Sequence, residues 1–93
     1  VAEIARKKLD YYFRKAKENY PELENMNYTM VVKEGNPSDV IISYAKEHDM
    51  HLVVIGYRGQ SPLERLVVGS TASNVGRYAH CSVLIYRPGE RII

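Results

Sequence analysis

The chain has 93 residues, a formal net charge of +2, one cysteine and 45% hydrophobic residues. This length allows one small domain with a thin stability margin, and the single cysteine excludes an internal disulfide and favours a reducing, cytoplasmic setting. The charge is too small to indicate a nucleic-acid partner, and no apolar run approaches the roughly 20 residues that span a bilayer.

The first predicted helix runs from residue 1 to about Asn19, because apolar side chains recur at intervals of three and four residues. Pro21 ends it, since the residue before a proline is pushed away from helical angles. The apolar face is expected to hold Val1, Ile4, Ala5, Leu9, Tyr12, Phe13, Ala16 and Tyr20. Acidic residues interrupt the basic ones, which favours a solvated face over a binding patch. These basic residues are Arg6, Lys7, Lys8, Arg14, Lys15 and Lys17.

A strand is predicted next, over Tyr28 to Val32, from its β-branched and aromatic residues. The following helix is predicted from Pro37 to about His48. Asn36 suits its N-cap position and Pro37 suits the first helical position.

The second half of the chain alternates in the same way. Leu52 to Ile55 is a continuous apolar run, which fits a parallel strand buried on both faces. A loop from Gly56 to Val68, a helix from Ser70 to about Tyr78 and a strand from Val83 to Tyr86 follow. Strands that alternate with helices predict an α/β fold with a parallel sheet. Six tyrosines are expected to pack on helix faces or strands: Tyr11, Tyr12, Tyr20, Tyr44, Tyr78 and Tyr86.

Glycines mark the segment with the clearest chemical meaning, Gly56-x2-Gly59-x9-Gly69-Ser70. Gly59 can take positive φ, and Gly69 allows a tight turn into a helix. The hydroxyls and free N–H groups at Ser70 and Thr71 can hold an anion, helped by the helix dipole. The pattern therefore predicts a phosphate site at a strand end. An ordinary turn at the glycines and an ordinary N-cap at Ser70 stay open as alternatives.

At residues 51–88 the chain resembles the C-terminal part of a universal stress protein domain. The glycine signature carries the resemblance, together with Ser61–Leu66, His80-Cys81 and the Gly35-Asn36-Pro37 turn. The resemblance implies that residues 1–93 are a single, incomplete universal stress protein domain. It also implies a Rossmann-like three-layer fold of the adenine nucleotide alpha hydrolase type, without its first two strands.

The resemblance further implies that the signature binds ATP together with Mg²⁺. Arg58 has two readings, a phosphate contact and a solvated loop arginine. The implied binding residues are Ile55, Gly56, Arg58, Gly59, Gly69, Ser70 and Thr71.

The chain also departs from the family pattern. The missing strands belong between Tyr28–Val32 and Leu52–Ile55, and they carry the adenine side of the family's site. Three explanations are open: a partial sequence, strands from another chain, or different pairing in a shortened domain. We favour the first, because the sequence starts mid-pattern and without Met.

Three functions are therefore weighed, of which a phosphate-using enzyme of another α/β family is disfavoured by the absence of the acidic residue and general base. The first is a cytoplasmic, nucleotide-binding stress-response regulator. It is not expected to be an enzyme beyond slow ATP hydrolysis, since the sequence holds no base–nucleophile pair and no P-loop lysine. The second is an interaction module of the same fold that binds no nucleotide. The last strand, Ser82 to Tyr86, is the usual dimer edge in the family, so a homodimer is expected in either case.

Overall fold

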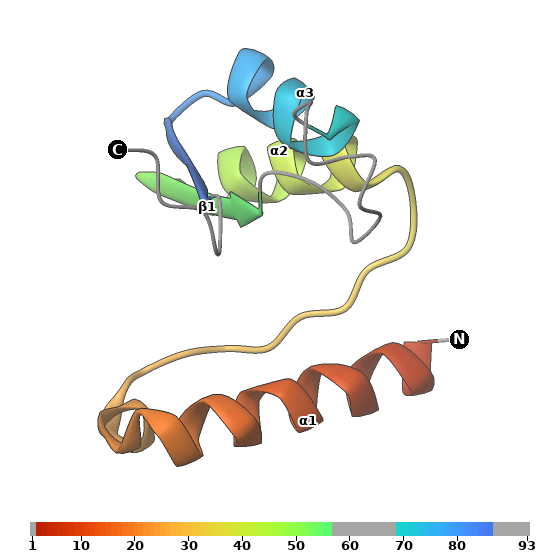
Figure 1. The fold of residues 1–93 in the computed structure, drawn as a ribbon. Coiled ribbons are helices and arrows are strands. Elements are labelled where there is room, and N and C mark those ends of the chain that lie inside the picture. The colour runs from red at the N-terminus through yellow and green to blue at the C-terminus, as the bar shows by residue number, and fades with distance from the viewer. Residues whose placement is uncertain (1, 57–68, 87–93) are drawn as a thin grey trace. The chain divides into compact units, whose positions relative to one another are not determined.

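The computed structural model describes residues 2–56 and 69–86. Contacts divide the chain into two compact units, residues 1–34 and 35–93, which are taken in turn. Figure 1 shows the elements in chain order from red to blue. They are α1 (Ala2–Asn19), the 3₁₀ helix η1 (Pro21–Asn25), α2 (Pro37–Glu47), β1 (Leu52–Gly56), α3 (Ser70–Tyr78) and β2 (Ser82–Tyr86). No helix in this part of the chain is both long and apolar enough to cross a membrane.

The first unit consists of α1, η1 and the residues up to 34. α1 ends at Asn19, as predicted from the proline at position 21. The N–H of Tyr20 still donates to the carbonyl of Ala16 at 2.8 Å, after which Pro21 begins the single turn of η1. The predicted polar connection therefore contains a short 3₁₀ helix.

The faces of α1 differ from the prediction. Leu9, Phe13 and Ala16 are half-buried, whereas Ile4 is 63% exposed and no residue of α1 is fully buried. Ile4 lies five residues before Leu9, about 140° away around a helix of 3.6 residues per turn. Placing Ile4 on the Leu9 face was therefore wrong.

The predicted strand over Tyr28–Val32 is also wrong, because residues 26–34 form neither helix nor strand. A strand forms only when a neighbour satisfies its backbone, and β propensity reflects that packing more than the residues themselves. Tyr28 instead stacks on Phe13 of α1, with ring centroids 4.2 Å apart.

In the second unit, both ends of α2 are fixed by side-chain and backbone hydrogen bonds. The N-cap prediction is confirmed: the Asn36 side chain accepts the Asp39 N–H at 3.1 Å and the buried Ser38 hydroxyl at 2.9 Å. At the other end the Met50 N–H donates to the Ala45 carbonyl at 2.9 Å, closing a Schellman motif. Asp49 occupies the left-handed position of this motif, with φ of 54°.

The two strands form a parallel pair, which confirms the predicted parallel sheet. Their register runs from Leu52 opposite Ser82 to Gly56 opposite Tyr86. Each strand is one residue longer than predicted, because this last pair and the Leu52–Ser82 pair join the ladder.

α2 and α3 contact each other, and α3 contacts β2 (Figure 1). The buried residues of this layer are small: Ala45 of α2, with Ala72 and Val75 of α3, are no more than 2% exposed. On the strands, Val53 and Ile55 are half-buried.

The opposite face of the strand pair is exposed, so the prediction of burial on both faces was wrong. Successive side chains alternate across a strand, and the register sets partners on the same side. The exposed face therefore holds Leu52, Val54, Leu84 and Tyr86, whose exposures are 54%, 60%, 53% and 58%.

Five of the six tyrosines that were expected to pack are at least half exposed. They are Tyr11, Tyr12, Tyr20, Tyr78 and Tyr86, at 50%, 62%, 62%, 63% and 58%. The exception is Tyr44, which is half-buried and stacks on His48 with ring centroids 4.0 Å apart.

Candidate functional site

The predicted binding residues that the structure describes lie at the end of β1 and the start of α3. In Figure 1 the arrow of β1 points to the right, whereas α2 and α3 begin on the right and run back to the left. This follows from the βα order, because a helix that returns along a parallel strand begins at the strand's carboxyl end. Ligands of open α/β sheets bind at that end.

Ile55 and Gly56 occupy the end of β1. Ile55 is half-buried and pairs with Ile85, so its side chain belongs to the helix-covered face of the strands. A Cβ built on Gly56 would meet no atom of the described residues within 4 Å. Among the described residues the strand end thus leaves space beside its backbone, and glycine presents no side chain to a ligand that approaches there.

The start of α3 is an uncapped helix N-terminus. Gly69 is the N-cap residue and has no side chain to bond the first-turn N–H groups. The first intrahelical bond runs from the Ser73 N–H to the Gly69 carbonyl, at 2.9 Å. The N–H groups of Ser70, Thr71 and Ala72 precede it, and such groups take their partners from outside the helix.

The first turn of α3 itself supplies no negative charge to the positive end of the helix. Its first turn has no acidic residue, and the Ser70 side chain is exposed while Thr71 is half-buried. The alternative of Ser70 as an ordinary N-cap does not describe this helix, because Gly69 takes that position and Ser70 is the first helical residue.

The start of α2 lies at the same edge, which sequence reasoning treated only as a helix boundary. The order of α2 before β1 is the signal for this, since a helix that packs alongside the parallel strand it leads into begins near that strand's carboxyl end. This N-terminus is already satisfied, however, because Asn36 caps it and Asp39 adds a negative charge to its first turn. The two helix starts therefore differ in what they offer to an anion.

Arg58 and Gly59 lie outside the described residues, as does the Ser61–Leu66 stretch. The structure places Ile55 and Gly56 at the end of β1, Gly69 at the N-cap of α3, and Ser70 and Thr71 in its first turn. The binding role of all seven residues stays a prediction.

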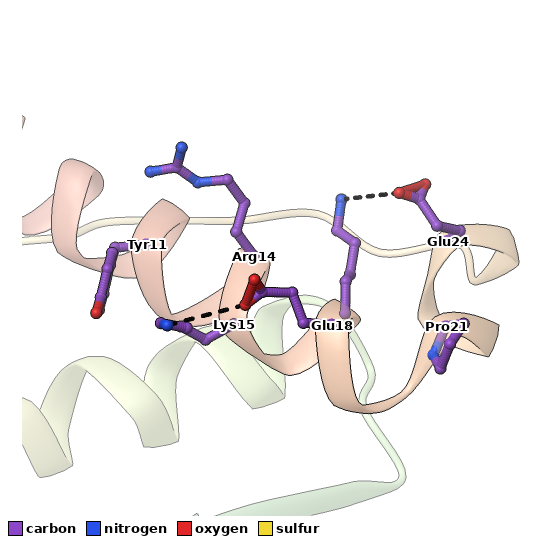
Figure 2. A pocket seen from close by; sticks show the side chains of 7 residues that line it. Tyr11, Arg14, Lys15, Glu18, Pro21 and Glu24 are labelled. Carbon is purple, nitrogen blue, oxygen red and sulfur yellow. Dashed lines mark ion pairs between the residues drawn. The ribbon is translucent and has the colours of Figure 1, made fainter.

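Within the described ranges, no group of three or more His, Cys, Asp or Glu side chains is placed to hold a metal ion. A groove of about 710 Å³ lies along α1 and η1, in the first unit, and includes none of the predicted nucleotide-binding residues (Figure 2).

Comparison with known proteins assigns the chain to a family. The model of the universal stress protein family matches residues 2–87. The chain belongs to the universal stress protein family. Family membership carries the Rossmann-like α/β fold, of which the parallel β1–β2 pair and its helices are the described part.

Curated relatives agree with this assignment. A universal stress protein of Methanothermobacter thermautotrophicus is 34% identical over 67 residues, covering 72% of this chain and 45% of the relative. One from Methanocaldococcus jannaschii is 36% identical over 58 residues, covering 62% and 34%. YxiE, a universal stress protein of Bacillus subtilis, is 40% identical over 53 residues, covering 57% and 36%.

The chain thus spans less than half the length of these relatives. No solved structure gives a significant match. The treatment of residues 1–93 as one incomplete domain stays a prediction.

Proposed function

We propose that the chain is a nucleotide-binding, stress-response regulatory protein that holds ATP, with Mg²⁺, at the edge formed by β1 and α3. One observation carries the proposal: within the described residues, the N-terminus of α3 has no side-chain cap and no acidic residue in its first turn, and the strand that precedes it ends in Gly56, whose Cβ position meets no described atom. Such a helix start stabilises phosphate through its N–H groups and its dipole.

In this proposal the phosphates lie against Gly69, Ser70 and Thr71, and the ribose lies near Ile55 and Gly56. Arg58 and Gly59, from the loop between these elements, complete the set that the signature predicts. The site is proposed as a binding site rather than a catalytic one, and any hydrolysis of ATP would be slow. The cytoplasm is the proposed location.

Thermal unfolding with and without Mg-ATP tests the proposal. A ligand at a hundredfold excess over its dissociation constant stabilises the folded state by about 2.7 kcal/mol, which raises Tm by roughly 10 °C in a chain of this size. Ser70→Ala and Gly69→Val should reduce the rise. Ser43→Ala, at an exposed position of α2, serves as the matched control and should keep it.

The test compares the rise in Tm on adding Mg-ATP between the unsubstituted chain and the three variants. If Mg-ATP leaves Tm unchanged, or if all variants shift equally, ATP does not bind at the start of α3. The unliganded Tm of each variant shows whether it is folded before ATP is added.

A second function is favoured by the exposure of β2. Leu84, Ile85 and Tyr86 are 53%, 36% and 58% exposed on a strand whose outer edge has no partner among the described residues. An open edge with apolar side chains is suited to pairing with another chain. The alternative is therefore a module that forms a homodimer through Ser82–Tyr86 and binds no nucleotide.

Sedimentation equilibrium separates the two functions. A dimer that Tyr86→Lys dissociates, in a chain whose Tm does not respond to Mg-ATP, supports the interaction module. A chain that stays monomeric over the concentration range removes this alternative.

A further inference from the structure

The side of α1 opposite its half-buried stripe combines exposed apolar side chains with basic ones. We name it the outer face, and it consists of Ile4, Lys7, Lys8, Tyr11, Arg14 and Lys15. Its members are three or four residues apart, a spacing that places side chains next to one another on a helix. Ile4 is 63% exposed and Tyr11 is 50% exposed.

The outer face is not the side of α1 that packs within its unit. Phe13 packs on Tyr28, and with Leu9 and Ala16 it forms the half-buried stripe. Tyr11 lies two residues before Phe13, about 160° away around the helix. Burial of the Phe13 stripe therefore leaves Tyr11 and Ile4 in solvent, beside the cations of the outer face.

The net charge of α1 differs in sign from that of the rest of the chain. α1 holds six of the 13 basic residues and three of the 11 acidic ones, a net charge of +3. The other residues hold seven basic and eight acidic side chains, a net charge of −1. The positive excess of the chain is thus confined to this helix.

Among the residues that the structure describes, most cations of the outer face have no carboxylate partner. Lys7, Lys8 and Arg14 form no salt bridge with any described residue. Lys15 pairs with Glu18 at 3.9 Å, but both side chains are more than half exposed. Water screens such a pair strongly, so an incoming carboxylate can replace Glu18 at little cost.

A groove gives this face a concave end. Tyr11, Arg14 and Lys15 line one part of it, and Glu18, Pro21 and Glu24 line the remainder together with Lys17 (Figure 2). Lys17 is held by Glu24 at 3.8 Å, whereas the Arg14 guanidinium points away from both ion pairs drawn. Arg14 is therefore positioned to meet a group that arrives from outside.

We propose that the outer face of α1 is a docking surface for an acidic protein segment that carries an apolar side chain between its carboxylates. Tyr and Arg are the residues that most often anchor protein interfaces, and here they adjoin on one helix face. The carboxylates would meet Lys7, Arg14 and Lys15, and the apolar side chain would lie on Tyr11 and Ile4. Charge complementarity of this kind sets both the choice of partner and the rate of encounter.

Other anionic partners fit this face less well. Insertion into a lipid surface needs a broad apolar face, and here Ile4 and Tyr11 are surrounded by charges, including Glu18. Nucleic acid needs a continuous basic stripe, which Glu3, Asp10 and Glu18 interrupt on this helix.

The test uses the 93-residue chain and a fluorescein-labelled peptide, (Glu-Glu-Leu)₄, with binding followed by anisotropy. Tyr11→Ser and Arg14→Gln should each raise the dissociation constant by at least about fivefold, the change produced by losing roughly 1 kcal/mol. Tyr78→Ser and Arg77→Gln are the matched controls, because both residues are exposed on α3, and they should leave binding unchanged. Added salt should weaken binding.

Three further probes decide the nature of the partner. The peptide (Glu-Glu-Ser)₄ should bind at least about fivefold more weakly, because it cannot use Tyr11. The proposal is overturned if this peptide binds as tightly as the Leu peptide, or if Tyr11→Ser has no effect. It is also overturned if phosphatidylserine vesicles or a DNA duplex bind while the Leu peptide does not.

Discussion

At the scale of single residues, Gly35 has the most constrained backbone position that the structure describes. Its φ is +132°, a conformation that side chains rarely adopt, and a Cβ built there would lie 3.0 Å from Val40 Cγ2. Gly76 provides a contrast within α3, since its Cβ would lie at an ordinary 3.4 Å from Ile85 Cδ1. The same substitution should therefore have opposite effects at the two positions.

We predict that Gly35→Ala lowers the free energy of unfolding by more than about 1 kcal/mol, through strain at positive φ and contact with Val40. Gly76→Ala should raise it by up to about 1 kcal/mol, because alanine is the better helix former. Urea denaturation of both variants measures the two changes. Equal effects of the two substitutions would contradict the account.

At the scale of elements, α2 and α3 begin in different ways at the same edge. α2 is stabilised by its own cap, whereas α3 leaves its first turn open. The stability of the unit therefore draws on the start of α2, and the proposed binding draws on the start of α3. Substitutions at the two helix starts should separate these properties.

Asn36→Ala should lower the free energy of unfolding by about 1 kcal/mol, since it removes the acceptor for the Asp39 N–H and the Ser38 hydroxyl. Asn36→Asp keeps an oxygen acceptor at the same place and should retain most of that stability. Thermal or urea unfolding measures both variants. A cost in Asn36→Asp as large as in Asn36→Ala would show that the cap is not the source.

At the scale of the whole molecule, the exposed face of the strand pair is the largest departure from a closed α/β fold. Parallel sheets are normally covered on both faces, yet Leu52, Val54, Leu84 and Tyr86 are each more than half exposed here. The chain that carries this exposed face spans less than half the length of the relatives it matches.

We predict that the 93-residue chain binds the dye anilinonaphthalene sulfonate through this face. Replacing both Val54 and Leu84 with Lys should remove most of the dye fluorescence, because these two residues pair directly across the strands. Glu47→Lys, at an exposed position of α2, controls for the added charge. Unchanged fluorescence in the double variant would show that the dye binds elsewhere.

The sequence predicted those elements whose signals are local. Asn36 and Pro37 mark the start of α2, and the apolar runs at 52–55 and 83–86 mark strands that find each other as parallel neighbours. Tyr28–Val32 shows the limit, because its β-rich residues become a strand only beside a partner. The predictions of which faces of α1 and of the strands are buried were wrong for the same reason, because burial depends on what packs against each face.

The candidate site was predicted in part. The glycine signature located the end of β1 and the start of α3, which one loop joins in the chain. Whether a helix start is capped depends on the φ, ψ and side chain of one residue, here Gly69, and only the structure shows it.

The strand register has a consequence for how faithfully this unit folds. Leu52 to Ile55 and Val83 to Tyr86 are apolar on both faces, so sliding one strand by a residue exchanges one apolar row for another. Alternation of apolar and polar residues fixes the register of most strands, but here it distinguishes poorly between the observed register and one shifted by a residue. The alignment rests instead on α3, which lies between the strands in the chain and is anchored by Ala72 and Val75. The packing of this short helix therefore sets the position of β2 along β1.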